Sequence, residues 1–166
     1  SQIGSSLRSR IVLSALGNSL DFFENPEDAL AQIPGRLQRG LDFYLDDIDR
    51  LDAFLSKRPE LILFFSDNSG EIYFDIPLFE YMRKRSARTV LVVKGGPSLN
   101  DLTREELQHA GLHEKFEEII DTGTNGAGIS WEDVPSTFMD FVQDCDLILS
   151  KGMANFETVY TRKLPC

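Results

Sequence analysis

The sequence predicts an α/β fold in which an N-terminal helical segment precedes a core built on a mainly parallel sheet. Beyond residue 60 the chain carries four short apolar runs, at 61–65, 89–93, 118–120 and 146–149. The polar residues that end these runs are spaced by 27, 27 and 30 positions, as Asp67, Lys94, Asp121 and Lys151. That spacing fits one strand, one turn and one crossover helix, the unit that joins parallel strands.

The segment before the core has helical periodicity. Apolar side chains recur every three or four positions, at Leu37, Leu41, Leu45, Ile48, Leu51 and Leu55. Such a stripe predicts a helix that buries one face, and Pro59 ends the pattern. We therefore predict a helical segment over residues 1–58 that packs on an α/β core over residues 59–166, the two forming one structural domain.

Two further signals refine the helical segment. Residues 7–23 also have a helical period, but Gly17 lies in their middle and is unfavourable in a helix interior, so we expect a break there. Asn25 followed by Pro26 is a helix-start signature, because asparagine caps the first turn and proline tolerates the first helical position.

Within the core, the strands and one helix have clear local signals. The four apolar runs are continuous rather than alternating, which is typical of parallel strands covered by helices on both faces. Thr103 with Glu106 has the spacing of a capping box, and Gly111 marks the end of the helix that begins there.

Composition narrows the class of protein. The 166 residues suit one domain, and 17 basic against 27 acidic side chains give a net charge of −10, which argues against a nucleic-acid or anionic-membrane surface. No apolar run reaches the roughly 18 residues of a membrane helix. With only Cys145 and Cys166 there is no disulfide framework, so we expect a cytoplasmic location. The chain begins with Ser1 rather than methionine, as a processed or cut piece of a longer chain would.

Polar stretches follow all four predicted strands. They read "SDNSGE", "KGGPSLND", "DTGTNGAG" and "SKGMANFE" in chain order. Because ligands of open parallel sheets bind beyond the carboxyl ends of the strands, we expect these loops to form one site. Their glycines would bring backbone N–H groups close to a ligand.

The residue types in these loops point to a metal and a phosphate. Carboxylate and amide oxygens suit Mg²⁺ or Mn²⁺, and Asp67, Asn68 and Asp101 are the candidate ligands. Glu71 is placed to position or deprotonate a water. The candidates for binding phosphate oxygens are Lys94, Lys151 and Asn155.

Each of these motifs has a plain structural alternative when taken alone. An Asp–Asn pair at a strand end is commonly a turn, and "NDLT" reads as a helix cap. "KGGP" lacks the serine or threonine of a P-loop, and the glycine-rich "GTNGAG" follows the third strand rather than the first. The convergence of all four loops on one edge is what favours a functional site.

The motifs taken together resemble a known family. "GNSLDF", "DNSGE", "GPSLND", "GTNG" and "SKGMANFE", in that order over residues 11–162, are similar to the metal-dependent damage-control phosphatases, also called domain of unknown function 89, and to their microbial DNxGE-type branch. The resemblance implies a Rossmann-like three-layer core. It also implies a divalent-metal-dependent phosphatase that hydrolyses phosphate monoesters of small metabolites, such as sugar phosphates or damaged phosphometabolites.

The resemblance also implies roles for individual residues. The family pattern places the metal on Asp67, Asn68 and Asp101, with Mg²⁺ or Mn²⁺ expected and Co²⁺ or Ni²⁺ as further candidates. Catalytic roles would fall to Asp67, Glu71 and Asp101. The substrate and its phosphate would be bound by Asn18, Asp21, Lys94, Asn100, Lys151, Asn155 and Glu157.

The sequence also departs from the family pattern. Members are generally longer, with more helical sequence before the "GN" motif and another strand after the position of "KLPC". The alternative reading is therefore a non-catalytic nucleotide- or phosphometabolite-binding module, or an inactive truncated form. A methyltransferase-like domain fits less well, because its glycine-rich turn would follow the first strand.

Overall fold

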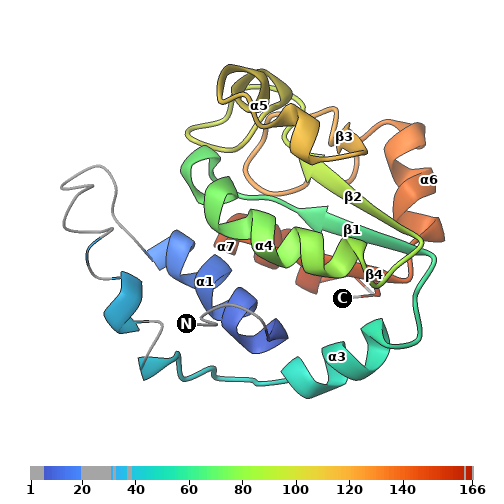
Figure 1. Cartoon of the computed structure of the whole chain (residues 1–166). Coiled ribbons are helices and arrows are strands. Elements are labelled where there is room, and N and C mark those ends of the chain that lie inside the picture. Colours follow the sequence, from blue (N-terminus) through green and yellow to red (C-terminus); the bar gives the residue numbers. More distant parts are fainter. Residues whose placement is uncertain (1–5, 20–30, 32, 37–38, 163, 166) are drawn as a thin grey trace.

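The computed structural model describes residues 6–19, 31, 33–36, 39–162 and 164–165. Its centre is a four-stranded sheet in which all pairs are parallel and the strand order is β3-β2-β1-β4 (Figure 1). The strands are β1 (Leu61–Phe65), β2 (Arg88–Val93), β3 (Ile119–Asp121) and β4 (Leu147–Ser150). All four predicted strands and the parallel sheet are confirmed.

The sheet is the middle of three layers, because its residues alternate between two apolar clusters. In β1, Ile62 and Phe64 pack with α1 (Leu7–Ser19), α3 (Ile48–Leu55), α4 (Ile72–Arg83) and α5 (Arg104–His109). Leu61, Leu63 and Phe65 face the other side and pack with α6 (Ser136–Asp144) and α7 (Met153–Tyr160). Burial on both faces explains why the strand sequences are continuously apolar.

The N-terminal segment is helical in separate pieces, so the single stripe predicted over residues 37–55 is wrong in part. Besides α1 and α3, residues 31, 33–36 and 39 are helical, whereas residues 40–47 are not. Gly40 takes a left-handed φ of 73°, which ends a helix at low cost. Leu45, predicted to be buried, is 78% exposed. A carboxylate oxygen of Asp46 then accepts the N–H of Ile48, where α3 begins.

Gly17 does not break α1, which continues to Ser19. A Cβ at Gly17 would lie 2.9 Å from Cβ of Phe74 on α4, so the glycine allows the two helices to approach closely. The predicted break is therefore wrong, and the residue serves packing. The predicted cap at Asn25 and Pro26 lies outside the described residues.

The predicted start and end of α5 are confirmed. Thr103 accepts the backbone N–H of Glu106 while the Glu106 carboxylate accepts the N–H of Thr103, which forms the capping box. Gly111 follows the helix with a left-handed φ of 67°. Among the described residues, none of the helices combines the length and the apolarity that a membrane crossing requires.

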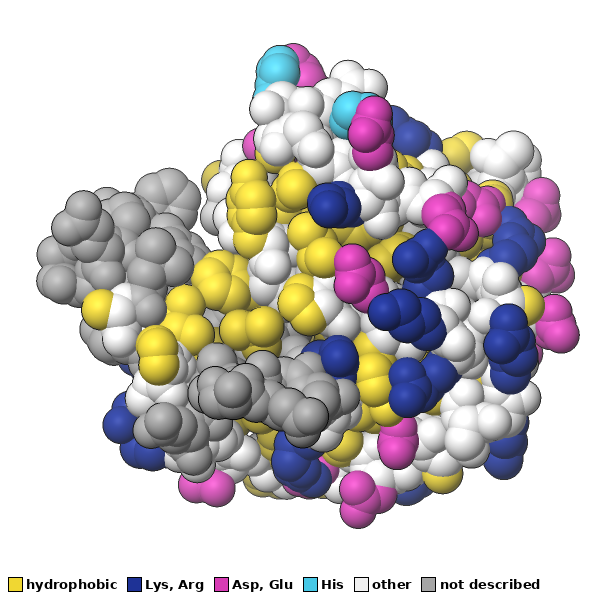
Figure 2. All heavy atoms as spheres, viewed as in Figure 1, with side chains coloured by type: hydrophobic (Ala, Val, Ile, Leu, Met, Phe, Trp, Pro, Cys, Tyr) yellow, Lys and Arg dark blue, Asp and Glu magenta, His cyan; other side chains and the backbone are white. Residues whose placement is uncertain are grey.

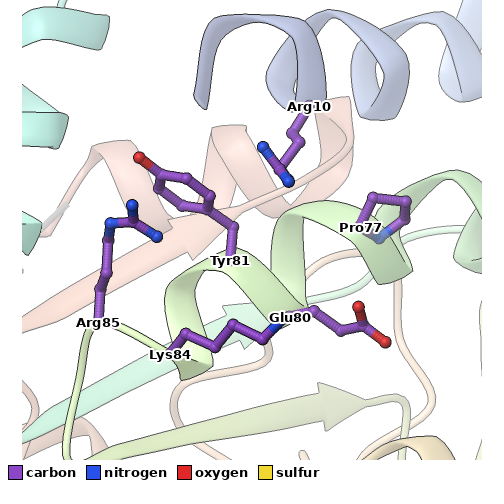
Figure 3. Close-up of a pocket in the computed structure, with 6 residues that line it drawn as sticks. All are labelled: Arg10, Pro77, Glu80, Tyr81, Lys84 and Arg85. Carbon is purple, nitrogen blue, oxygen red and sulfur yellow. The ribbon is translucent and has the colours of Figure 1, made fainter. Parts of the chain in front are cut away.

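Basic side chains gather on the face of the molecule that α4 presents to solvent (Figure 2). A hollow of about 190 Å³ lies over the C-terminal half of this helix, and Figure 3 shows its lining residues, Arg10, Pro77, Glu80, Tyr81, Lys84 and Arg85. The guanidinium carbons of Arg85 and Arg10 lie 3.6 and 4.8 Å from the centre of the Tyr81 ring. The predicted acidic and amide residues lie instead at the opposite, N-terminal end of α4, where β1 ends.

Candidate active site at the carboxyl edge of the sheet

Backbone hydrogen bonds join the loops that follow β1 and β2. The carbonyl of Asp67 accepts the N–H of Leu102 at 2.7 Å, and the N–H of Ser69 donates to the carbonyl of Asn100 at 2.9 Å. Between these two bonds, Asn68 and Asp101 form an isolated antiparallel bridge. The three residues predicted to bind a metal are therefore brought together by the backbone itself.

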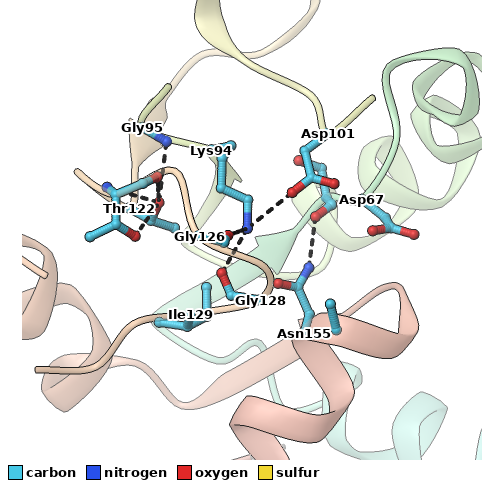
Figure 4. Close-up of polar contacts among 12 residues, drawn as sticks. Asp67, Lys94, Gly95, Asp101, Thr122, Gly126, Gly128, Ile129 and Asn155 are labelled. Carbon is cyan, nitrogen blue, oxygen red and sulfur yellow. Dashed lines mark hydrogen bonds and ion pairs between the residues drawn. The ribbon is translucent and has the colours of Figure 1, made fainter. Parts of the chain in front are cut away.

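Lys94, at the end of β2, ties the loop after β3 to this pair. Its ammonium group lies 3.1 Å from a carboxylate oxygen of Asp101 and donates to the carbonyls of Gly126 and Gly128 at 3.1 and 2.7 Å (Figure 4). The glycine-rich loop thus offers carbonyl oxygens to the lysine. Since all three hydrogens of the ammonium have acceptors in the protein, a phosphate would have to displace one of them.

Lys151, after β4, lies on the other side of β1 and has different partners. Its Nζ is 2.7 Å from Oε2 of Glu71, 2.7 Å from Oδ1 of Asp75 and 3.3 Å from the carbonyl of Ser14. The Ser14 hydroxyl also donates to Oδ1 of Asp75 at 2.6 Å. The lysine therefore joins α1 and the start of α4 to the sheet.

The sequence analysis missed Asp75 and Ser14. A signal for Asp75 was present, since residues four apart lie on one face of a helix and Glu71 is four positions before it. Ser14 has no comparable signal, because it is separated from Lys151 by 137 positions and only the packing of α1 brings it close.

Asn68 connects the two carboxylates on either side of it. Its side-chain nitrogen donates to Oε1 of Glu71 at 2.5 Å and lies 3.2 Å from Oδ2 of Asp67. With its nitrogen facing these carboxylates, the amide oxygen is the Asn68 atom left for a cation.

Asn155 and Gly152 shape the site from α7. The Asn155 amide donates to the carbonyls of Ser66 and Lys151 at 2.9 and 2.8 Å, so its N–H groups hold the strand ends. Gly152 has a φ of 85°, and a Cβ there would lie 2.3 Å from an oxygen of the Asp67 carboxylate. The glycine leaves the space in which that carboxylate sits.

Buried carboxyl groups dominate the electrostatics of the cluster. Burial, and then the charges of Glu71 and Asp101, raise the pKa of Asp67 to about 6, against the opposing effect of the two lysines. Burial likewise raises the pKa of Asp75. When ionised, the four carboxylates of Asp67, Glu71, Asp75 and Asp101 face the ammonium groups of Lys94 and Lys151. Two negative charges remain uncompensated, which is the charge of one divalent cation.

The donor set fits such a cation by its chemistry. Two carboxylates and an amide oxygen are hard ligands of the kind that Mg²⁺ and Mn²⁺ prefer. No group of three or more His, Cys, Asp or Glu side chains with the arrangement of a metal site occurs in the described ranges. The predicted trio contains only two such residues, so the metal site stays a prediction.

The remaining predicted residues lie further from the cluster or outside the description. Asn18 belongs to α1, but its side chain is not described, and Asp21 lies outside the described residues. Asn100 is exposed and contributes its carbonyl, which accepts the N–H and hydroxyl of Ser69. Glu157 is exposed on α7, and in the described part of the chain no hydrogen bond joins it to the cluster. Their roles stay predictions.

Comparisons with known proteins agree with the motifs. The family described as "Damage-control phosphatase ARMT1-like domain" matches residues 2–165. The damage-control phosphatase PH1575 of Pyrococcus horikoshii is 40% identical over 152 residues, covering 90% of this chain and 52% of that protein. A damage-control phosphatase of Archaeoglobus fulgidus is 26% identical over 155 residues, covering 90% and 52%.

The fold agrees as well. The crystal structure of the Pyrococcus protein, a DUF89 family member, matches 98% of this chain and 56% of its own with a TM-score of 0.85 and 34% sequence identity. This chain thus spans about half the length of the curated relatives that it matches.

Proposed function

This chain belongs to the family of the damage-control phosphatase ARMT1-like domain, and from that premise we propose that it hydrolyses phosphate monoesters of small metabolites with the help of a divalent metal ion. Sugar phosphates and damaged phosphometabolites are the substrate class. The proposal includes a cytoplasmic location, which the small number of cysteines supports.

One observation carries the proposal. The side chains of Asp67, Asn68 and Asp101 are brought together at the sheet edge, in a cluster whose four carboxylates, when ionised, outnumber its two ammonium groups by two charges. Uncompensated buried charge is unfavourable, so such carboxylates either hold a proton or bind a counter-charge. Perturbed carboxylates in such a place are typical of functional sites.

The metal would be held by Asp67, Asn68 and Asp101. When bound, a divalent ion neutralises phosphate charge and orients the attack on phosphorus. Lys94 fixes Asp101 in place through its ion pair, and the Leu102 N–H fixes the backbone of Asp67.

The chain's own residues then set the protonation of the site. Both oxygens of the Glu71 carboxylate accept hydrogen bonds, from Asn68 and Lys151, which holds the group in one orientation. In the metal-free protein the pKa of Asp67 is raised to about 6, so a cation that binds there at acidic pH must displace its proton. Trapping a phosphorylated protein with a labelled ester would distinguish direct attack by Asp67 from attack by water.

The test is phosphate release from a panel of phosphate esters, with Mn²⁺, Mg²⁺ and EDTA arms. Asp67→Ala is the test variant, and Asp140→Ala, at an exposed position of α6, is the matched control. We expect release that needs metal, persists in the control and vanishes in Asp67→Ala. Binding of a phosphometabolite without turnover would favour the alternative of a non-catalytic binding module. A folded protein with neither release nor metal binding would remove the metal site from the proposal.

A further inference from the structure

Asp75 is the most deeply buried charged side chain of the cluster, with 1% of its surface exposed. Its Oδ1 accepts hydrogen bonds from Lys151 and Ser14, whereas its Oδ2 is buried without a hydrogen-bond partner among the described residues. Burying a carboxylate with one oxygen unsatisfied is costly. The arrangement therefore calls for a reason other than stability.

Stability alone would be served at least as well by an apolar residue. Replacing buried ion pairs by well-packed apolar side chains is commonly neutral or stabilising. Asp75 lies on α4 among Ile72, Leu78 and Phe79, all buried in one apolar cluster, so an apolar environment is already present. What an apolar residue could not supply there is an acceptor for Lys151.

The acceptor on Asp75 completes the surroundings of Lys151. The three ammonium hydrogens are directed at Glu71, at Asp75 and at the carbonyl of Ser14. Lysine has a flexible four-carbon side chain that is costly to order, and three acceptors, on α1, on α4 and on the turn just before α4, hold it in one place. Since α1 packs beside α4 (Figure 1), the N-terminal helix takes part in this restraint.

From Lys151 a continuous chain of contacts runs to the predicted metal ligands. Lys151 holds Oε2 of Glu71, Asn68 donates to Oε1 of Glu71, and the same Asn68 nitrogen lies 3.2 Å from Asp67. Each step is a contact between charged or amide groups inside the protein, where such bonds are strong. A change at Asp75 would thus be transmitted to Asp67 through groups that have little freedom to move.

We propose that Asp75 is a positioning residue, which, with the Ser14 hydroxyl, fixes Lys151 and through it orients Glu71 and Asn68 toward Asp67. The effect on turnover rests on the proposed phosphatase function, whereas the restraint on Lys151 does not. The two parts therefore have separate readouts.

The first readout is the rate at which an amine-reactive ester acetylates Lys151, measured by peptide mass spectrometry. This readout does not require that the protein turn over a substrate. In Asp75→Asn we expect acetylation of Lys151 at least about tenfold faster than in the wild type, the ratio expected when a neutral amide oxygen replaces the charged acceptor of one ammonium hydrogen. Met82→Ala is the control, because Met82 is fully buried on the same helix and its loss weakens packing without touching Lys151. Equal labelling of Lys151 in the wild type, Asp75→Asn and Met82→Ala would overturn the proposal.

The second readout is steady-state kinetics with the best ester of the panel. We expect Asp75→Asn to lower kcat by about 10–100-fold with a smaller change in KM, as is usual for groups that support metal-site residues. Met82→Ala should keep its kcat once corrected for the folded fraction. An unchanged kcat in folded Asp75→Asn would overturn the positioning role in catalysis. If the wild type shows no turnover, the proposed function fails, and the labelling still decides the restraint on Lys151.

Ser14→Ala keeps the test decisive if Asp75→Asn does not fold. This variant removes only the hydroxyl that donates to Asp75 and leaves the backbone carbonyl that accepts from Lys151. We expect labelling of Lys151 to rise about threefold, less than in Asp75→Asn, because all three acceptors of Lys151 remain and only the hydrogen bond that holds Asp75 is lost. Labelling at the wild-type rate in Ser14→Ala would overturn the proposal.

Discussion

Lys94 and Lys151 end the two strands that flank β1, and the same sequence pattern predicted the same role for both. Lys94 pairs with one carboxylate, Asp101, whose side chain is 18% exposed, and with two carbonyls of a loop. Lys151 pairs with Glu71 and Asp75, whose side chains are 5% and 1% exposed. Lys94 joins the loops that surround the site, whereas Lys151 joins α1 and the start of α4 to the sheet.

The difference shows that the role of a lysine at a strand end depends on the segments that pack around it. The position of each lysine follows from the parallel sheet, but its partners come from segments far away in the sequence. The more deeply the partner carboxylates are buried, the more the fold depends on the cation that neutralises them. Two experiments test this comparison, and two more test the position and the pKa of Asp67.

The largest effect is expected for Lys151→Met. The substitution leaves the buried carboxylates of Glu71 and Asp75 without their cation, so we expect the free energy of unfolding to fall by about 3–5 kcal/mol. Denaturant unfolding followed by circular dichroism measures it. A loss below that of the corresponding Lys94 variant would reverse the comparison.

Lys94→Met should have a smaller effect on stability. Its partner carboxylate on Asp101 is partly solvated and can be hydrated when the lysine is removed, so we expect a loss of about 1–3 kcal/mol. The same denaturant measurement applies. Identical losses in Lys94→Met and Lys151→Met would mean that the depth of the partners does not matter here.

Gly152→Ala separates stability from metal binding. Gly152 combines φ 85° with ψ 153°, a backbone region essentially restricted to glycine, so alanine there should cost about 1–3 kcal/mol. Gly111 has a left-handed φ of 67°, where alanine should cost about 1–2 kcal/mol. At Gly111 nothing lies within 4 Å of the added methyl, whereas at Gly152 the methyl would displace the Asp67 carboxylate. We therefore expect Gly152→Ala to unfold at a temperature no higher than that of Gly111→Ala.

The two glycine variants should differ in calorimetric Mn²⁺ binding. Gly152→Ala should bind Mn²⁺ about 10–100-fold more weakly than Gly111→Ala, because a residue that positions a metal ligand is disturbed. Equal Mn²⁺ affinity in both would show that the position of Asp67 is not what Gly152 protects.

The smallest effect is the pH dependence that comes from Asp67. Its pKa is raised from 3.8 to about 6, so between these values the folded protein holds the proton more tightly than the unfolded chain. The contribution of Asp67 to the stability of the metal-free protein must therefore decrease as pH rises from about 4 to about 6. Mn²⁺ affinity should increase over the same interval, since a bound ion requires the deprotonated carboxylate.

The contribution of Asp67 is isolated by comparing the wild type with Asp67→Asn in EDTA across this pH range. The difference between their thermal unfolding temperatures should change with pH in the stated direction. A constant difference would contradict the raised pKa.

Much of the site could be predicted because it depends on local signals and one rule of parallel sheets. The four apolar runs are where the strands lie, and the loops after them meet at one edge as expected. Asp67, Asn68 and Asp101 come together because they follow neighbouring strands. The single helical stripe predicted over residues 37–55 was wrong in part, because its apolar period continues through residues 40–47, whereas the left-handed conformation of Gly40 ends the helix there.

The sequence by itself determined the strands, their burial on both faces and the acidic loops at their ends, since each depends on residues close together in the chain. Only the tertiary structure decided which partners hold the two lysines. Ser14 and Asp75 reach Lys151 because α1 packs on α4 at Gly17, a contact between segments that are distant in sequence. The direction of a buried lysine depends on the acceptors that such packing places around it, and no local pattern encodes them.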